Sequence, residues 1–432
     1  MGGLAGGGHA AALAADGNGR ALLSGVPLLA RPANASESYA ADRASKQWHP
    51  SKGDQLGPGE FGEGGISDMK RVVIIGAGPA GAAAAMSLVR HRGVQIQLLD
   101  RAAFPRRKVC GSGLSPWALE LLDRMELGRQ VRREAYPIRA AVVGGAGGHA
   151  VELRSQYQAA VLLRERFDTL LAHEAARRGA LLREGVQVTG IVRDGGRLRG
   201  VRTSQGGIEA DAVIVCNGAN TTIARAPRPG KTLHAILGWY EGVAGVRDAV
   251  ELYFDALVKP YYGWVFPESA TRVNIGLCFA PEPGGLNARQ RFDAFLDSRL
   301  GKRMKDARQL GKLVGHPIAT CSRPTALVRE GTLVAGEAGG LVDPATAEGI
   351  HLALASGWMA GRFLGGLLER GEEPTQERLA PYTRLVRRHL GRRLQAGQLF
   401  LEVARTPVLD FVLRFGSLRP VQALLTWMLT GA

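Results

Sequence analysis

Three glycines, Gly76, Gly78 and Gly81, form a G-x-G-x-x-G motif, and Asp100 follows 24 residues after the first of them. In a dinucleotide-binding turn, the first glycine permits a tight turn, the second lets the backbone approach a pyrophosphate, and the third lets a helix pack closely on a strand. The acidic residue accepts hydrogen bonds from ribose hydroxyls. These residue types at this spacing therefore predict a nucleotide cofactor, provided that a strand, a helix and a second strand surround them.

The segments around the motif have the required pattern. A short β-branched run, RVVIIG (71–76), precedes it, and a strong helix former, AAAAMSLVR (82–90), follows it. A second apolar run, VQIQLLD (94–100), ends in Asp100. Such runs are typical of buried parallel strands. The helix N-terminus would offer free N–H groups and a positive dipole end to the phosphates.

A second glycine cluster, GGAGG (144–148), is followed by the alternating segment HAVELRS. Alternation on both sides of a glycine cluster is typical of a β-hairpin, so we interpret this cluster as a turn rather than a second nucleotide site. The sequence then predicts a single dinucleotide fold, which disfavours a reductase with separate FAD and NAD domains.

Four cysteines lie far apart, and Cys110 follows the basic run 106–108 in a Gly-rich loop. Neighbouring cations could lower the pKa of its thiol for acid–base work; the alternative is that the loop only packs its backbone against a cofactor. Cys216 and Cys278 lie within apolar strand patterns and are predicted to be buried in the core. The lack of a C-x-x-C pair excludes a zinc ribbon, and no metal site is predicted.

Tyr262, Trp264 and Phe266 alternate along one predicted strand, so their side chains share a face. This face is either plain core or the wall of an apolar substrate pocket. His351 is predicted to have a structural role rather than a catalytic one.

Four segments together carry a family resemblance. They are FPRRKVCGSGLSPWALELL (104–122), LLRERFDTLLAHEAARRGA (162–180), YYGWVFPES (261–269) and LVAGEAGGLVDPATAEGIHLALASGWMAG (333–361). The set resembles the geranylgeranyl reductase family of flavoproteins, which belongs to the FAD enzymes shaped like aromatic hydroxylases. The resemblance covers roughly residues 69–400, and its specific parts are the K-x-C-G-x-G-L and Y-x-W-x-F-P elements.

The resemblance implies an FAD cofactor and roles for particular residues. Ala80 would contact the pyrophosphate, Arg164 would reach the phosphate region, and Val188 would flank the adenine. Glu337 would hold the ribityl hydroxyls. The loop from Cys110 to Gly113 would lie against the flavin, and the helix beginning at Gly349 and Ile350 would face its N1–C2=O edge, where a positive dipole end stabilises negative charge. The predicted cofactor-binding residues are Gly76, Gly78, Ala80, Gly81, Asp100, Arg101, Cys110, Gly111, Gly113, Arg164, Val188, Gly336, Glu337, Gly349 and Ile350.

The chain departs from the family pattern in three places. Glu337 stands where the family usually has Asp, and is one methylene longer. The family's G-E-G is Ala347-Glu348-Gly349, and its Asp-Gly-Ala is Asn217-Gly218-Ala219. The backbone contacts to a flavin stay possible in each case.

The resemblance implies an oxidoreductase that reduces isolated C=C bonds of an isoprenoid (geranylgeranyl-type) chain by hydride transfer from reduced flavin. Cys110, Tyr262 and Trp264 are the candidate catalytic residues, as pocket wall or proton donor. The alternative is an FAD-dependent monooxygenase of an aromatic or polyketide-like substrate, because one fold hosts both reactions. A halogenase is disfavoured because YGWVFP does not match its W-x-W-x-I-P element. A non-catalytic flavin-binding protein is a third class. NADPH and ferredoxin stay open as the electron donor.

The predicted fold class is α/β: a Rossmann-like FAD-binding domain with a β-sheet substrate domain and a helical C-terminal segment. The predicted division is 1–68 as a disordered leader or non-native extension, 69–229 as the first part of the FAD-binding domain, 230–324 as the substrate-binding sheet domain, 325–370 as the closing segment of the FAD-binding domain, and 371–432 as C-terminal helices. Residues 1–68 are Gly-rich and lack an apolar period, so we expect Met69 to be the natural start.

Composition narrows the class of partner. The 432 residues contain 55 Lys+Arg against 39 Asp+Glu, a net charge of +16. This excess indicates either anionic partners or simply an Arg-rich surface, and no nucleic-acid-binding signature is present. Arginines at 384, 387, 388, 392 and 393 crowd one side of an amphipathic helix, which predicts peripheral membrane contact; the alternative is that this helix closes the substrate domain with a solvated Arg face. The scattered cysteines fit a reducing compartment, so the predicted localisation is cytoplasmic.

Overall fold

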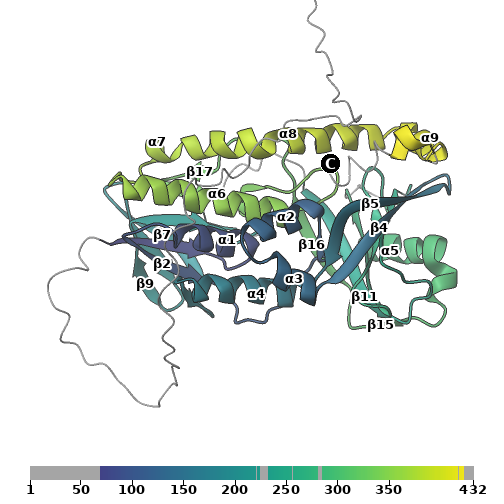
Figure 1. Cartoon of the computed structure of the whole chain (residues 1–432), viewed down its shortest axis with the longest axis horizontal. Coiled ribbons are helices and arrows are strands. Elements are labelled where there is room, and N and C mark those ends of the chain that lie inside the picture. Colours follow the sequence, from purple (N-terminus) through teal and green to yellow (C-terminus); the bar gives the residue numbers. More distant parts are fainter. Residues whose placement is uncertain are drawn as a thin grey trace, which may run out of the picture. The chain divides into compact units, whose positions relative to one another are not determined.

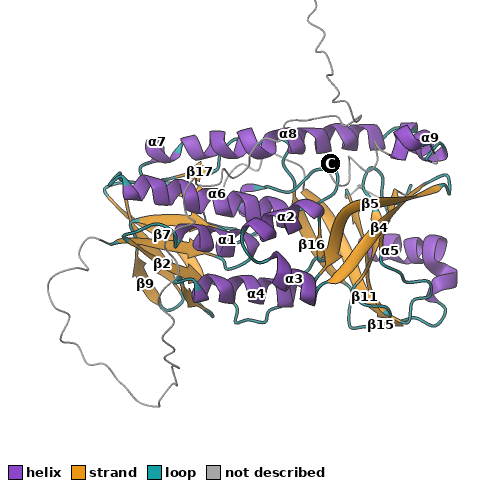
Figure 2. Cartoon of the chain, viewed as in Figure 1, coloured by secondary structure: helices purple, strands orange, loops and turns teal. Residues whose placement is uncertain are grey.

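The computed structural model describes residues 69–422, except 220, 224–231, 255, 281–284 and 417. The leader predicted over 1–68 and residues 423–432 of the predicted C-terminal helices lie outside the described residues. Within the described part, the chain forms two large sheets, a small third sheet and helices that pack on them (Figures 1 and 2).

The glycine motif follows the central strand of a largely parallel sheet. β1 (Lys70–Ile75) pairs in parallel with β2 (Val94–Leu99) on one side and with β10 (Ala212–Val215) on the other. The strand order is β17-β18-β10-β1-β2-β6. The outer strands are β6 (Leu181–Arg183), β17 (Val328–Arg329) and β18 (Thr332–Val334). All of β10 is buried, as expected for a strand covered on both faces.

Three helices pack together beside this sheet. α1 (Pro79–Leu88) follows β1 and is buried along its whole length. It contacts α4 (Arg164–Arg177) and α6 (Ile350–Glu369). The predicted strand, glycine turn, helix and second strand are therefore all present.

α1 and α6 approach each other through small residues. A Cβ atom at Gly357 would lie 2.0 Å from the Ala80 carbonyl oxygen, and one at Gly361 would lie 2.3 Å from the Ala84 carbonyl oxygen. Only glycine fits at these two positions. Since both helices begin at the cavity described below, their close packing sets the spacing of two helix N-termini at the site.

The second sheet has nine strands in the order β15-β11-β14-β13-β12-β4-β5-β3, with β16 pairing to β11. The strands are β3 (Gly113–Leu114), β4 (Tyr136–Gly145), β5 (Ala150–Val161), β11 (Thr232–Glu241), β12 (Ala249–Phe254), β13 (Gly263–Pro267), β14 (Arg272–Phe279), β15 (Arg308–Gln309) and β16 (Val314–Ala319). A small third sheet contains β7 (Val188–Asp194), β8 (Arg197–Thr203) and β9 (Gly206–Glu209).

The hairpin predicted at GGAGG (144–148) is confirmed, since β4 and β5 pair antiparallel across it. The predicted division placed all of residues 69–229 in the FAD-binding domain, but the strands of this hairpin do not join the parallel sheet of that domain. β4 pairs in parallel with β12, with Ala140 opposite Ala249 and Gly145 opposite Phe254, so the hairpin belongs to the second sheet. This pairing joins segments distant in sequence, which local patterning does not reveal.

The two faces of the second sheet have different neighbours. One face packs on α5 (Ala288–Phe295), where Phe292 and Phe295 are fully buried. The opposite face, which includes Leu237 and Trp264, forms a cluster with residues of the C-terminal helices. The remaining helical segments are α2 (Pro116–Arg124), α3 (Gly128–Glu134), a π-helical turn (Leu296–Leu300) and 3-10 turns at Gly301–Met304 and Gly336–Gly339.

The C-terminal segment forms α7 (Gln376–Leu379), α8 (Pro381–Ala404) and α9 (Val408–Arg414). Near the start of α8, the buried Tyr382 hydroxyl donates to the Ser356 carbonyl of α6 at 3.1 Å. At its other end, α8 joins the apolar cluster of the second sheet. Among the described helices, none combines the length and hydropathy needed to cross a bilayer.

The prediction that five arginines form one basic face of α8 is partly wrong. Arg384, Arg388 and Arg392 are exposed, as predicted. Arg387 instead donates from Nε and Nη2 to the Pro324 carbonyl, and Arg393 turns inward. The Arg393 guanidinium carbon lies 3.5 Å from the centroid of the Trp117 ring. The helix period alone did not show that α2 and the α6 N-terminus offer Arg393 partners.

Candidate functional site

A single continuous cavity of about 1180 Å³ runs from the parallel sheet to the second sheet. Its lining includes Gly78, Asp100 and Val188 at one end and Leu252 and Phe254 at the other. Small-molecule sites usually measure about 300–1,000 Å³. The cavity therefore has room for more than a compact ligand. All predicted cofactor-binding residues except Gly81 and Gly336 line it.

The three glycines of the motif differ in what requires them. Gly76 has φ +97°, and a Cβ atom at Gly81 would lie 1.8 Å from the Gly76 carbonyl oxygen. Gly78 has open space, its nearest neighbour being Arg106 Nη2 at 3.5 Å from the Cβ position. Gly78 is also the N-cap of α1, and no side chain caps it. An uncapped helix N-terminus facing a cavity fits a bound pyrophosphate, which is the fit that an FAD cofactor requires.

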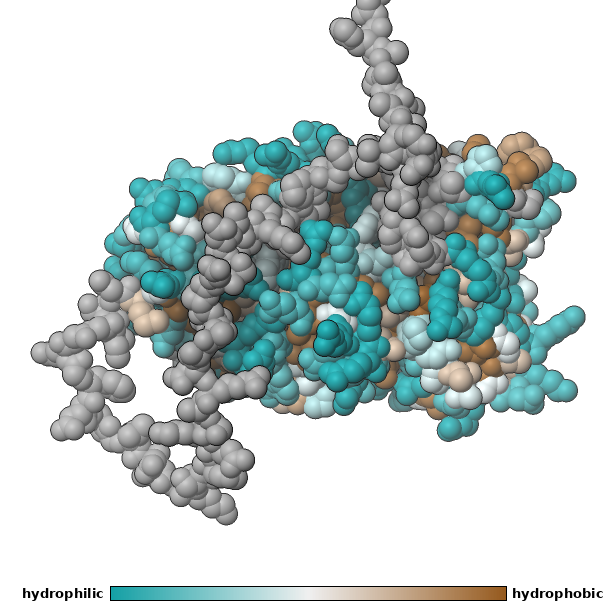
Figure 3. All heavy atoms as spheres, viewed as in Figure 1, coloured by the Kyte–Doolittle hydropathy of each residue, from teal (hydrophilic) through white to brown (hydrophobic). Residues whose placement is uncertain are grey.

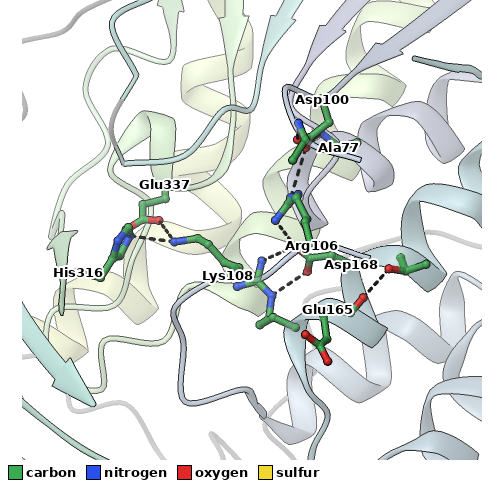
Figure 4. A network of polar contacts seen from close by, with 11 residues as sticks. Ala77, Asp100, Arg106, Lys108, Glu165, Asp168, His316 and Glu337 are labelled. Carbon is green, nitrogen blue, oxygen red and sulfur yellow. Dashed lines mark hydrogen bonds and ion pairs between the residues drawn. The ribbon is translucent and has the colours of Figure 1, made fainter. Parts of the chain in front are cut away.

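Asp100 is held firmly at the end of β2. Its Oδ2 accepts from the Ala77 N–H and its Oδ1 from the Ala102 N–H, both at 3.0 Å. Arg106 lies between two carboxylates, with Nη2 3.3 Å from Asp100 Oδ2 and Nη1 3.1 Å from Asp168 Oδ2 (Figure 4). The Arg106 Nε is buried without a hydrogen-bond partner. The sequence pattern indicated Arg106 only as a cation near Cys110. It did not predict the ion pair with Asp168, because Asp168 is distant in the chain.

Arg164 lies in the cavity wall, and its guanidinium is bonded within the protein. Nε and Nη2 donate to the two oxygens of the fully buried Asp168, at 2.7 and 2.9 Å. Burial lowers the pKa of Arg164, but Asp168 and a hydrogen bond with Cys110 more than offset this and raise it. The arginine therefore stays charged and ties α4 to the Cys110 loop; its contact with a phosphate stays a prediction.

A second polar group joins Lys108, His316 and Glu337 (Figure 4). Lys108 Nζ lies 2.8 Å from His316 Nε2 and 3.9 Å from Glu337 Oε2. Burial, then the Lys108 charge, lowers the pKa of His316 to about 4, so the ring is neutral and accepts from the ammonium. Burial also lowers the pKa of Lys108, while Glu337 raises it. No sequence pattern predicted a role for His316, because only the pairing of β16 with β11 brings it to this site.

The predicted aromatic face is confirmed. The ring centroids of Tyr262 and Trp264, and those of Trp264 and Phe266, are each 6.2 Å apart, and all three side chains line the cavity. A Cβ atom at Gly111 would lie 3.1 Å from the Phe266 ring, and one at Gly113 would lie equally close to it. These glycines therefore let the Cys110 loop lie on the aromatic wall.

Cys216 and Cys278 are buried as predicted, and both also line the cavity. Burial raises the pKa of both thiols, that of Cys278 to about 12, so both are neutral. Burial likewise raises the pKa of Tyr262 well above its ordinary value. The Tyr262 hydroxyl donates to the Thr346 carbonyl. Among the candidate catalytic residues, Cys110 contacts the charged side chain of Arg164.

The turn before α6 carries groups that the sequence did not identify. Gly349 is the N-cap of α6 and has no capping side chain, as a helix end facing a ligand requires. Asp343 and Glu348 lie just before it and line the cavity with Arg393. His351 is buried, as its predicted structural role requires, with Nδ1 2.8 Å from Arg393 Nη1.

The far end of the cavity is an apolar chamber. It lies between the second sheet and the C-terminal helices, and most of its side chains belong to one buried cluster. The chamber is lined by Val143, Leu153, Ala235, Leu237, Leu252, Phe254, Tyr262, Trp264, Leu399, Phe400, Val403, Leu409 and Val412. It can accept an extended apolar molecule.

Comparison with known proteins agrees with this architecture. A family profile described as FAD binding domain matches residues 69–384. Menaquinone reductase of Mycobacterium tuberculosis is 30% identical over 332 residues, which cover 69% of this chain and 77% of that protein. Digeranylgeranylglycerophospholipid reductase 1 of Methanothermobacter thermautotrophicus is 28% identical over 335 residues, covering 74% and 83%.

Solved structures share the fold. A geranylgeranyl bacteriochlorophyll reductase-like protein of Thermoplasma acidophilum has a TM-score of 0.73 at 19% identity, covering 84% of this chain and 97% of that one. The myxobacterial chondrochloren halogenase has a TM-score of 0.66 at 19% identity, with the same coverage. The sequence matches agree with the structure, in which uncapped helix N-termini face a cavity that fits a bound FAD. The chain therefore belongs to the FAD-binding-domain family and is an FAD-dependent oxidoreductase, with sequence similarity to reductases of isoprenoid lipids.

Proposed function

We propose that this oxidoreductase reduces isolated C=C bonds in an isoprenoid, geranylgeranyl-type chain. The observation that carries the proposal is the continuity of the cavity, which joins the uncapped N-termini of α1 and α6 to the apolar chamber. Reduced FAD, when bound, supplies a hydride to one alkene carbon. An unactivated alkene has no carbonyl to polarise, so the protein's part is to orient it, exclude water and deliver a proton.

The residues for the cofactor follow from their places in the cavity. Gly78 and Ala80 would face the pyrophosphate at the α1 N-terminus, where the dipole and free N–H groups favour anions. Asp100, held by the Ala77 and Ala102 N–H groups, would accept from the ribose. Glu337 would hold the ribityl hydroxyls, with Lys108 and His316 fixing its carboxylate.

The residues for the substrate are those of the aromatic wall. Tyr262 and Trp264 would position the alkene, and Cys110 would pack its loop beside the cofactor or move a proton. The Trp264 Nε1 donates to the Asn274 Oδ1 at 2.7 Å, and the Tyr262 hydroxyl is bonded to a carbonyl. Because these polar atoms are already paired, the two rings present mainly apolar surface to the chamber.

The relatives support a lipid substrate through the names menaquinone reductase and digeranylgeranylglycerophospholipid reductase. A place in lipid metabolism follows from this proposal. The reducing equivalents would come from NADPH or a reduced ferredoxin.

The alternative function, a monooxygenase, has the same fold, which is shared even with a halogenase. The two reactions differ in their need for oxygen. Purified FAD-loaded protein should convert geranylgeranyl diphosphate, without oxygen and with dithionite as reductant, to products heavier by two hydrogens per reduced bond. A product heavier by one oxygen atom, formed only in air, would replace the reductase with the monooxygenase.

We further propose that the chamber takes its substrate from an anionic lipid surface. Of the nine large hydrophobic side chains exposed in the described part of the chain, six lie at the end of α8, on α9 or just after it (Figure 3). We call these the apolar rim: Leu399, Val403, Val408, Phe411, Phe415 and Leu418. Leu399 and Val403 also line the chamber, so the rim is continuous with it. The exposed Arg414 and Arg419 lie beside the rim and complement anionic headgroups.

A further inference from the structure

Asp343 lies where the cofactor end of the cavity meets the apolar chamber. Its Oδ1 accepts from the Ala345 N–H at 2.9 Å and the Thr346 N–H at 3.0 Å. The carbonyl of Thr346 in turn accepts from the Tyr262 hydroxyl, so the carboxyl and the aromatic wall hold the same residue. The Asp343 N–H donates to the Glu348 carbonyl at 3.0 Å, which closes the loop just before Gly349.

α8 leaves space for this carboxyl and supplies a cation to it. A Cβ atom at Gly397 would lie 2.7 Å from Asp343 Oδ1, so only glycine lets the helix pass over it. Four residues earlier, the Arg393 Nε lies 3.8 Å from Asp343 Oδ2 and is buried without a hydrogen-bond partner. An N–H in this position can bond the carboxylate after a small movement.

Arg393 is shared with a second carboxylate. Its Nη2 pairs with Glu348, and its Nη1 contacts His351 Nδ1 at 2.8 Å. Glu348 also accepts from the Ser115 hydroxyl at 2.5 Å. The group formed by Asp343, Glu348, His351 and Arg393 therefore contains two carboxyls and one guanidinium, with Tyr262 facing it from the second sheet.

Charge balance in this group favours one bound proton. Burial lowers the pKa of His351 well below its ordinary value, so the imidazole is neutral. Two ionised carboxylates would then leave a net negative charge in a buried place, which is costly. Burial raises the pKa of Asp343, while Arg393 and the two N–H groups limit the rise. The contact of Asp343 with the Arg393 guanidinium is the longer one, at 3.8 Å, so we assign the proton to Asp343.

We propose that Asp343 is the general acid that protonates the second alkene carbon in the proposed reduction. The Asp343 O–H bond breaks as the new C–H bond forms, while the other carbon receives its hydrogen and both electrons from the reduced cofactor. The carboxylate left behind is stabilised by the Arg393 Nε and by the Ala345 and Thr346 N–H groups, and it regains a proton from solvent. The other candidates fit less well, since the Tyr262 hydroxyl is bonded to a carbonyl, the Trp264 Nε1 donates to Asn274, and the Cys110 sulfur is already held by Arg164 and the Ser112 N–H.

The inference rests on the proposed function, so the test begins with wild-type protein. Reduced, FAD-loaded wild type is mixed with geranylgeranyl diphosphate without oxygen; if no bond is reduced, the proposed function fails before Asp343 is tested. If bonds are reduced, Asp343→Asn should bind FAD with wild-type affinity but form product at least about 10²-fold more slowly, the usual scale for loss of a general acid. Glu268→Gln, which alters another buried carboxyl of raised pKa outside the cavity, should match wild type.

Two further measurements keep the proposal testable if Asp343→Asn folds poorly. In cofactor-free protein, the infrared carbonyl band of a protonated acid should titrate away with rising pH and be absent in Asp343→Asn, but present in Glu268→Gln. The wild-type rate should fall as pH rises through the same transition, and Arg393→Gln should move that fall to higher pH because the carboxylate loses its cation. The assignment of Asp343 as the general acid would be overturned if Asp343→Asn turned over at the wild-type rate. It would also be overturned if the rate of Arg393→Gln fell at the same pH as that of wild type.

Discussion

At the scale of single residues, Gly78 and Gly81 are glycines for different reasons. A Cβ atom at Gly78 would make only ordinary contacts, whereas one at Gly81 would lie 1.8 Å from a backbone oxygen. Gly78→Ala should therefore unfold in urea like wild type but bind FAD at least about tenfold more weakly, or 1.4 kcal/mol, because a methyl group occupies the path of the pyrophosphate. Gly81→Ala should instead lose about 1–3 kcal/mol or more of stability. Equal FAD affinity in Gly78→Ala and wild type would refute the cofactor placement.

His316 makes a pH-dependent contribution to stability. Its pKa in the folded protein is about 4, below the ordinary 6.5, so folding favours the neutral ring. The contribution is fully present above pH 6.5 and is lost as pH falls toward 4, where unfolded chains bind a proton that the folded protein resists. Urea unfolding of cofactor-free protein should show this loss, and His316→Gln should reduce it by roughly 2–3 kcal/mol. Identical pH dependence in the two proteins would show that the ring is already charged.

Some residues of the site could be predicted from the sequence and others could not. Asp100 follows from its distance to the glycine motif, and Cys110 and Glu337 from the family resemblance. The partners of Arg106 and Lys108 are not predictable in this way, because Asp168 and His316 come from other elements. The arrangement of charges at the site thus depends on tertiary contacts that no local pattern encodes.

At the scale of elements, the contact of α1 with α6 sets the distance between two helix N-termini at the cavity. Gly357→Ala would place a methyl group 2.0 Å from the Ala80 carbonyl oxygen. We expect it to lower the free energy of unfolding by about 1–3 kcal/mol and to weaken FAD binding. Gly366→Ala, in the same helix, has its nearest neighbour at 3.6 Å and should be neutral or stabilising by up to about 1 kcal/mol. Equal stabilities of the two variants would contradict the packing account.

Element types were predictable where the periodicity was clear. The strands and helix around the glycine motif, the hairpin at 144–148 and the long helix α8 were predicted from their patterns. The place of β4 and β5 in the second sheet was not, since parallel pairing with β12 leaves no signature in either segment. The inward turn of Arg393 was missed for a similar reason, because its partner Trp117 lies in α2 and its partner Glu348 in the turn before α6.

At the scale of the whole molecule, the apolar rim predicts reversible binding to lipid. Wild type should sediment with anionic vesicles at low salt, and Leu399→Ser or Phe411→Ser should reduce this, because the side chains are 68% and 62% exposed and lose apolar contact with lipid. Leu181→Ser, at an exposed position on β6, is the matched control and should bind like wild type. Arg414→Gln should weaken binding by about 1 kcal/mol, or roughly fivefold. Wild type that ignores anionic vesicles at low salt would refute the lipid surface.

We propose that one cavity brings the cofactor and an isoprenoid chain together. The most direct measurement is a single turnover without oxygen, in which the flavin of the purified protein is reduced, the reductant is removed, and geranylgeranyl diphosphate is added while the flavin absorbance is followed. The oxidised flavin spectrum should return in proportion to the bonds reduced. A flavin that stays reduced until air is admitted would contradict this proposal.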